Sequence, residues 1–306
     1  MNEILTALWP VFALLCIGYG IRRLNFPDDS FWEPAEKLIY FLLFPVLLVY
    51  KLSLAEIAAV PIFEVAAAVV GLLAAGSMLL ILVQRLRPLS GAAFTSVYQG
   101  GMRFNTYVGL AASAALYGDD SLAIAAVVIA LMVPLLNVLC VLVFSAYTQR
   151  ESSVASTLKA LCKNPLILAC LLGILLNLSG LGLPSMVSSV AQLLSSMALP
   201  LGLLAVGAGL NLTALRSAGG SVIYSSIIKL LFFPLLMLLI CSLFIDSYLV
   251  AAVLVLFSAL PTASTAYILA RQLSGDAPMM AAIITAQTIL SFLTIPVVLA
   301  LFNQFF

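Results

Sequence analysis

The chain has 306 residues, of which 64% are hydrophobic and 8% charged, and its formal net charge is +1. Ordinary soluble domains are about 45–50% apolar and about 25% charged. The composition therefore excludes a water-soluble fold and indicates one membrane domain over residues 1–306. No run of basic residues occurs, which excludes nucleic acid as a partner, because phosphate binding needs clustered Lys and Arg.

Apolar runs separated by polar residues, glycine or proline predict ten helices that cross the lipid bilayer, at about 20 residues per span. The predicted spans are 4–22, 35–52, 61–84, 91–117, 121–147, 164–180, 186–210, 218–244, 247–271 and 277–303. The first ends in Arg22-Arg23, whereas a cleaved signal peptide carries its positive charge before the apolar run. We therefore expect a retained first helix.

Basic residues mark one side of this ten-span arrangement. Those in or beside the odd-numbered loops are Arg22, Arg23, Lys37, Arg85, Arg87, Arg150, Lys159, Lys163, Arg216 and Arg271. Only Lys51 flanks the other side. Because positively charged loops stay in the cytoplasm, we expect both termini outside the cytoplasm, in the inner (plasma) membrane.

The two halves of the chain repeat a pattern of helix-bending and helix-packing residues. At an offset of 155 the matching pairs are Pro10 with Pro165, Gly18 with Gly173, and Pro45 with Pro200; at 157, Gly118-Asp119 matches Gly275-Asp276. This predicts two five-helix repeats, 1–150 and 151–306. Because five is odd, the second repeat starts on the opposite side of the membrane, which gives the inverted topology of many secondary transporters.

Two spans at equivalent places carry interruptions. The fourth contains Gly100 and Gly101 in a polar stretch, and the ninth contains Pro261 among Ser and Thr residues. Proline removes a helical hydrogen bond, and glycine departs easily from helix. We therefore predict a crossing pair of broken helices at matching depth. The alternative is that Pro261 only kinks its helix and that Ser and Thr bond back to the preceding turn.

Charge inside the spans suggests an anionic ligand. All acidic residues lie in loops or near helix ends, whereas Arg103 and Lys229 lie deep, where a basic residue costs about 2.5–3.5 kcal/mol. An anionic substrate is the simplest counter-ion, helped by the N-termini of half-helices. Alternatively, Lys229 snorkels toward water or bonds to carbonyl groups freed near the break, and Arg103 lies at the interface.

Several motifs resemble one known family over essentially the whole chain. They are Asn105-Thr106-Tyr107-Val108-Gly109, Pro261 through Tyr267-Ile268-Leu269-Ala270-Arg271 with Gly275-Asp276, Gly18-Tyr19 to Arg22-Arg23, and Lys229 to Pro234. This pattern resembles the auxin efflux carrier family in its short bacterial form, related to plant auxin exporters and to bacterial malate permease-like carriers. One departure is Ala111, near which family members often have a proline.

The resemblance implies a crossover fold similar to bile acid/sodium symporters and sodium-proton antiporters. Spans 1, 2, 6 and 7 would form a scaffold and the other six a moving core, with a homodimer through spans 2 and 7. It also implies a carboxylate bound near the crossing of spans 4 and 9. Together with the charge pattern, the candidate binding residues are Arg103, Asn105, Thr106, Lys229, Pro261, Thr262, Ser264, Thr265 and Gln287.

These observations predict a secondary transporter that moves a small organic anion, such as an auxin-like carboxylate or a dicarboxylate, by alternating access. No cofactor or metal site is expected, because the five cysteines show no ligand spacing. An enzyme is disfavoured because the chain has no His and no paired deep acids. The alternatives are a sodium- or proton-coupled carrier of another metabolite, a channel, and a membrane-embedded ligand sensor.

The driving ion is a separate question. A proton-driven carrier usually needs an intramembrane His, Asp or Glu, so proton coupling is disfavoured. Sodium could bind side-chain oxygens, for which the candidates are Asn105, Asn137, Gln287 and Thr288. A uniporter driven by the membrane potential needs neither, since each charge moved through 100 mV yields about 2.3 kcal/mol.

Overall fold

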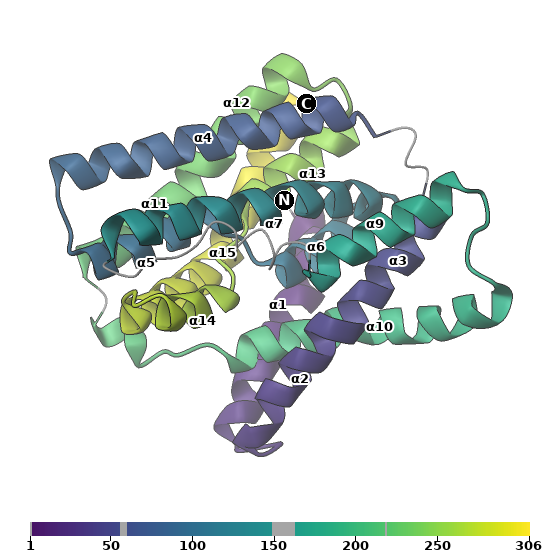
Figure 1. Ribbon diagram of the computed structural model, residues 1–306, viewed down its shortest axis with the longest axis horizontal. Coiled ribbons are helices and arrows are strands. Elements are labelled where there is room, and N and C mark those ends of the chain that lie inside the picture. The colour runs from purple at the N-terminus through teal and green to yellow at the C-terminus, as the bar shows by residue number, and fades with distance from the viewer. Residues whose placement is uncertain (1, 56–59, 149–162, 218) are drawn as a thin grey trace.

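The computed structural model describes residues 2–55, 60–148, 163–217 and 219–306, and all regular structure in these ranges is helical. Figure 1 shows long helices packed around each other. The α-helices are α1 (Asn2–Arg23), α2 (Trp32–Leu38), α3 (Phe44–Leu54), α4 (Ile62–Leu86), α5 (Gly91–Met102), α6 (Thr106–Tyr117), α7 (Asp120–Tyr147), α9 (Pro165–Leu178), α10 (Ser185–Ala208), α11 (Gly220–Ile227), α12 (Phe233–Phe244), α13 (Tyr248–Ala259), α14 (Thr265–Gln272) and α15 (Ala277–Phe305). Arg150, Lys159 and Cys162 lie outside the described residues.

Seven helices in the described ranges are long and apolar enough to cross a membrane. This agrees with the predicted all-helical membrane fold. The predicted spans 91–117, 164–180 and 247–271 are not long continuous helices. The first and third are each divided into two short helices, and α9, which replaces the second, has only 14 residues.

Two π-turns interrupt long helices just before Phe-Pro pairs. The turn η2 (Ile39–Leu43) joins α2 to α3, and η5 (Ile228–Phe232) joins α11 to α12. Proline at the second position of α3 and of α12 lacks an N–H group, so the preceding turn cannot close regular helical bonds. These turns place Tyr40 and Lys229.

Glycine allows two helix pairs to pack with their backbones in contact. A Cβ atom on Gly18 of α1 would collide with the carbonyl oxygen of Leu204 in α10. A Cβ atom on Gly173 of α9 would lie 3.2 Å from Cα of Val49 in α3. Small residues permit such close approach in membrane proteins, where packing drives helix association. These contacts hold α1 against α10 and α9 against α3, and α10 also packs against α3.

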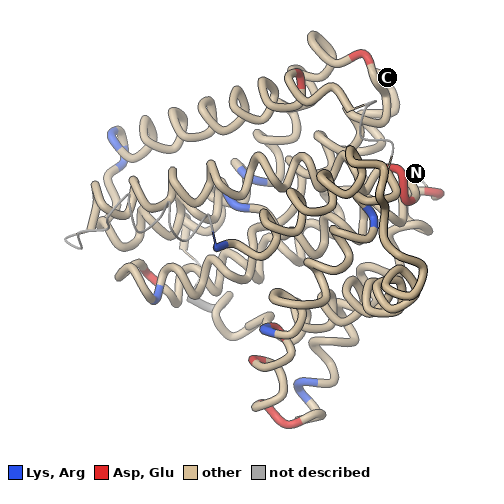
Figure 2. Tube along the Cα trace, turned by 45° about the vertical axis from the view of Figure 1, so that its right-hand side comes forward, with Lys and Arg blue, Asp and Glu red and all other residues tan. Residues whose placement is uncertain are grey.

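Charged residues are sparse along the middle of the helix bundle and gather toward helix ends and turns (Figure 2). Lys51, the one basic residue that the loop pattern leaves on the other side, pairs with Asp119 at 2.6 Å. Asp119 precedes α7, and the lysine lies near the end of α3. The ion pair therefore places these two helix ends on the same side of the molecule.

Candidate functional site

The two predicted interruptions lie where the sequence indicates. Arg103, Phe104 and Asn105 separate α5 from α6, and residues 260–264 separate α13 from α14. The backbone N–H of Asn105 donates to the carbonyl oxygen of Pro261 at 2.8 Å, so the two interruptions touch. Both stretches are therefore interrupted in the structure, and the interruptions lie side by side.

The paired glycines require a correction. Gly100 and Gly101 lie inside α5, which stays helical to Met102, so the prediction that they break the helix was wrong. A Cβ atom on Gly100 would lie 2.6 Å from Cγ2 of Ile283 and 2.7 Å from Oγ of Ser225. The small residue at 100 is needed for close helix packing rather than for backbone freedom.

One buried amide joins the last turn of α5 to the second interruption. The side-chain oxygen of Gln287, in α15, accepts from the backbone N–H of Thr262, and its nitrogen donates to the carbonyl oxygen of Gly100, each at 2.9 Å. Broken helices leave buried backbone groups that need partners. Gln287 and Thr262 therefore brace the crossing rather than face the cavity beside it.

A cavity of about 210 Å³ lies beside the interruptions. Its walls come from both interruptions, from the first turns of α6, α9 and α14, and from η2 and α7. The predicted binding residues that line it are Arg103, Asn105, Thr106, Ser264 and Thr265. The other lining residues are Tyr40, Phe104, Tyr107, Val133, Leu136, Asn137, Asn164, Leu166 and Ala263.

Asn105, which lines this cavity, carries an unpartnered donor. Its side-chain oxygen accepts from the backbone N–H groups of Tyr107 at 3.0 Å and Val108 at 3.2 Å, which caps the start of α6. This orientation leaves its Nδ2 atom buried without a hydrogen-bond partner in the described structure. An unpaired buried donor costs about 1–3 kcal/mol, so the site is poised to receive an acceptor.

Arg103 adds positive charge to the same wall. Its Nη2 atom donates to the side-chain oxygen of Asn137 in α7 at 3.0 Å, which fixes the guanidinium, and its Nη1 atom is buried without a partner in the described residues. Among the described residues that line the cavity, none is acidic. The field there is therefore positive, and the starts of α6, α9 and α14 add the positive ends of three helix dipoles.

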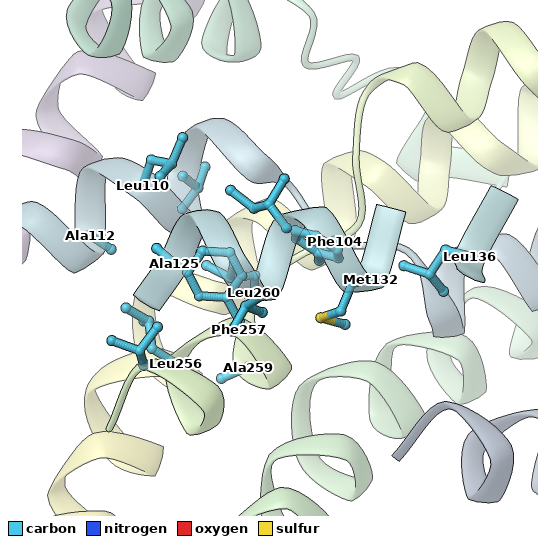
Figure 3. Packing of buried hydrophobic residues seen from close by; sticks show 14 of the residues in the cluster. Phe104, Leu110, Ala112, Ala125, Met132, Leu136, Leu256, Phe257, Ala259 and Leu260 are labelled. Carbon is cyan, nitrogen blue, oxygen red and sulfur yellow. The ribbon is translucent and has the colours of Figure 1, made fainter. Parts of the chain in front are cut away.

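The apolar part of the wall is anchored in the core. Phe104, from the first interruption, packs edge-on against Phe257 of α13, with ring centroids 5.6 Å apart. Figure 3 shows Phe104 among buried apolar side chains, with Met132 and Leu136 of α7 nearby. Leu136 also lines the cavity, so the cavity combines polar donors with apolar surface.

The sequence pattern matches the model of the membrane transport protein family over residues 3–299. The chain belongs to this family. The resemblance to auxin efflux carriers is thereby confirmed, and the chain is a multi-pass membrane transporter rather than an enzyme. No curated protein matches the chain.

Lys229 of this transporter lies away from the cavity that holds Arg103. Its side chain is completely buried in η5, its Nζ atom has no hydrogen-bond partner in the described residues, and it lies 5.0 Å from the ring centroid of Phe233. The idea that Lys229 snorkels to water therefore does not fit this arrangement. Pro261 also does not line the cavity, although its carbonyl oxygen supports Asn105.

Asn164 and Tyr40 line the transporter's cavity but were not among the predicted binding residues. For Asn164 a signal existed, because Asn followed by Pro165 is the usual start of a helix. For Tyr40 no local pattern pointed to the site. Asn137, which the sequence suggests as a sodium ligand, instead holds Arg103 at the cavity wall.

Proposed function

We propose that this transporter moves a small organic anion and binds its carboxylate in the cavity between the two interruptions. The observation that carries the proposal is the pair of unpartnered buried donors there, Asn105 Nδ2 and Arg103 Nη1. A carboxylate accepts hydrogen bonds from both types of donor and balances the guanidinium charge. The cavity of about 210 Å³ and its mixed walls suit a small metabolite.

The helix order supports an inverted repeat of five helical segments. The contact of Gly18 with Leu204 has a counterpart in the contact of Gly173 with Val49, because Gly173 follows Gly18 by 155 residues and Leu204 follows Val49 by the same offset. The caps of the two broken segments correspond at the offset of 157. Ser90 Oγ accepts from Ala93 N at 3.4 Å, and Ser247 Oγ accepts from Val250 N at 3.5 Å.

In this proposal ten segments cross the membrane, with α5–α6 and α13–α14 each making one crossing as a broken pair. The scaffold comprises α1, α2–α3, α9 and α10, and the remaining helices form a core that moves for alternating access. The loop charges support cytoplasmic odd loops in an inner membrane. The ion pair of Lys51 with Asp119 agrees, because both are assigned to the outer side. A homodimer through the second and seventh spans rests on the family resemblance alone.

The sodium candidates lie at different places in the structure. Of the four sodium candidates, only Asn105 and Asn137 line the cavity. Gln287 uses its side-chain oxygen on Thr262, and the Thr288 hydroxyl donates to the carbonyl oxygen of Ile284. The four candidates therefore do not converge on one site in this arrangement, which favours a carrier driven by substrate gradient and membrane potential over a sodium-coupled one.

A membrane-embedded sensor with the same site is the second candidate, since it needs the same free donors. The deciding experiment is a thermal-shift screen of small carboxylates on the purified protein, with and without sodium, followed by flux of the best ligand into proteoliposomes. Saturable flux supports a carrier, and binding without flux supports a sensor. If no carboxylate stabilises the protein, the proposal fails, because a ligand stabilises in proportion to its occupancy.

A further inference from the structure

Asn164 stands at the start of α9 and lines the same cavity as Asn105. It is 9% exposed. Its side-chain oxygen accepts from the backbone N–H groups of Leu166 at 2.9 Å and Ile167 at 3.4 Å. Asn105 caps α6 in the same way. Capping uses the oxygen of each amide, which leaves each Nδ2 atom as a donor.

The short length of α9 explains how its start reaches the cavity. Its 14 residues span about 21 Å at 1.5 Å per residue, which is less than the roughly 30 Å of the hydrocarbon core. Its far end is held level with the end of α3, because Asn177 Nδ2 donates to the carbonyl oxygens of Ser53 at 3.3 Å and Ala55 at 2.6 Å. The start of α9 therefore lies partway along this membrane crossing, near Tyr40 in η2, and not at the end of the crossing.

The two asparagines start different helices. α9 packs mainly against α3 and also against η2 and α7, whereas α6 packs against α7, α1, α10 and α13, so α7 is a neighbour of both. Asn105 is 2% exposed and its Nδ2 atom has no hydrogen-bond partner in the described residues, which indicates a ligand in this cavity. A ligand that contacts both amides would thus be held by two separate walls of the cavity.

We propose that Asn164 is a second substrate-binding residue, whose Nδ2 atom donates to the anion bound at Asn105. The inference rests on the proposed function, and it assigns a binding role to α9. A bound anion then links α6 to α9, which share few direct contacts. Ligand binding therefore stabilises this arrangement of α6 relative to α9.

The test distinguishes the role of Asn164 as a hydrogen-bond donor to the anion from its role as the cap of α9. In Asn164→Ser and Asn164→Asp the new side chain keeps an oxygen that caps α9, but the amide donor is lost, and Asp also places negative charge beside the anion. We expect both variants to melt near the wild-type temperature without ligand. Their affinity for the anion should fall about tenfold to a hundredfold, as for loss of one bond to a charged group. Asp should show the larger loss.

The probe is whichever of succinate, malate, benzoate and indole-3-acetate stabilises the wild-type protein most. The matched control is Ser90→Ala, which removes the cap of α5 outside the cavity and should leave anion affinity unchanged. Wild-type affinity in both Asn164 variants overturns this inference. If Asn105→Ser still loses affinity in that case, the proposed function stands. If the wild-type protein binds none of the four acids, both fail.

Discussion

Substitutions of Asn105 test whether the cavity binds the substrate. This side chain has two roles, helix capping and hydrogen-bond donation, and different substitutions remove them separately. Its oxygen caps α6 and its nitrogen is free for substrate. Asn105→Ala removes both. Loss of the cap costs about 1 kcal/mol of stability, and loss of a bond to a charged group costs about 1.5–3 kcal/mol of binding. Asn105→Ser keeps a capping oxygen but loses the amide donor.

We expect the two substitutions to have similar effects on anion affinity but different effects on the stability of the protein. Both variants should bind the anion about tenfold to a hundredfold more weakly, at 1.4 kcal/mol per decade, whereas only Asn105→Ala should unfold measurably more easily. Thermal unfolding in detergent, with and without ligand, together with initial flux in proteoliposomes, measures both quantities. Val108→Ala, at a buried apolar neighbour, controls for packing damage and should change flux much less. Wild-type affinity in both Asn105 variants would refute the assignment of the site.

Three further predictions concern the crossing and the topology. Pro261→Ala should let helical hydrogen bonding extend into residues 260–264, so that transport falls while the protein stays folded; wild-type flux would show that the interruption is not needed. Gly100→Ala should destabilise the fold by about 1–3 kcal/mol through overpacking. Gly101→Ala should cost less, because its nearest neighbour is the side-chain end of Leu80 at 3.1 Å; equal thermal stability of the two variants would contradict this reading. An outside-only cysteine label should reach positions beside Asp119 and Asp246 but not beside Arg85 or Arg216; labelling of all four in sealed, right-side-out vesicles would exclude the ten-span arrangement.

The sequence by itself determined the features that depend on neighbouring residues. Apolar runs indicated where helices form, since a membrane helix must satisfy its own backbone. Pro261 indicated an interruption because it lacks an N–H group, and the polar residues around Asn105 indicated the other. These are local causes, and the structure interrupts both helices there.

Only the tertiary structure decided which side chains share the cavity. Asn164 lines the same cavity as Asn105 because α9 is short and tied to α3 at its far end. No pattern near residue 164 predicts this placement. The sequence predicts that Gly100 breaks its helix. In the structure, glycine is needed at this position because a Cβ atom would collide with Ile283, which is distant in sequence. Lys229 and Arg103 looked equivalent as deep basic residues, but helix packing turns only Arg103 toward the cavity. The physical reason is that the binding site forms where faces of several helices pack together. That packing depends on contacts between residues distant in sequence.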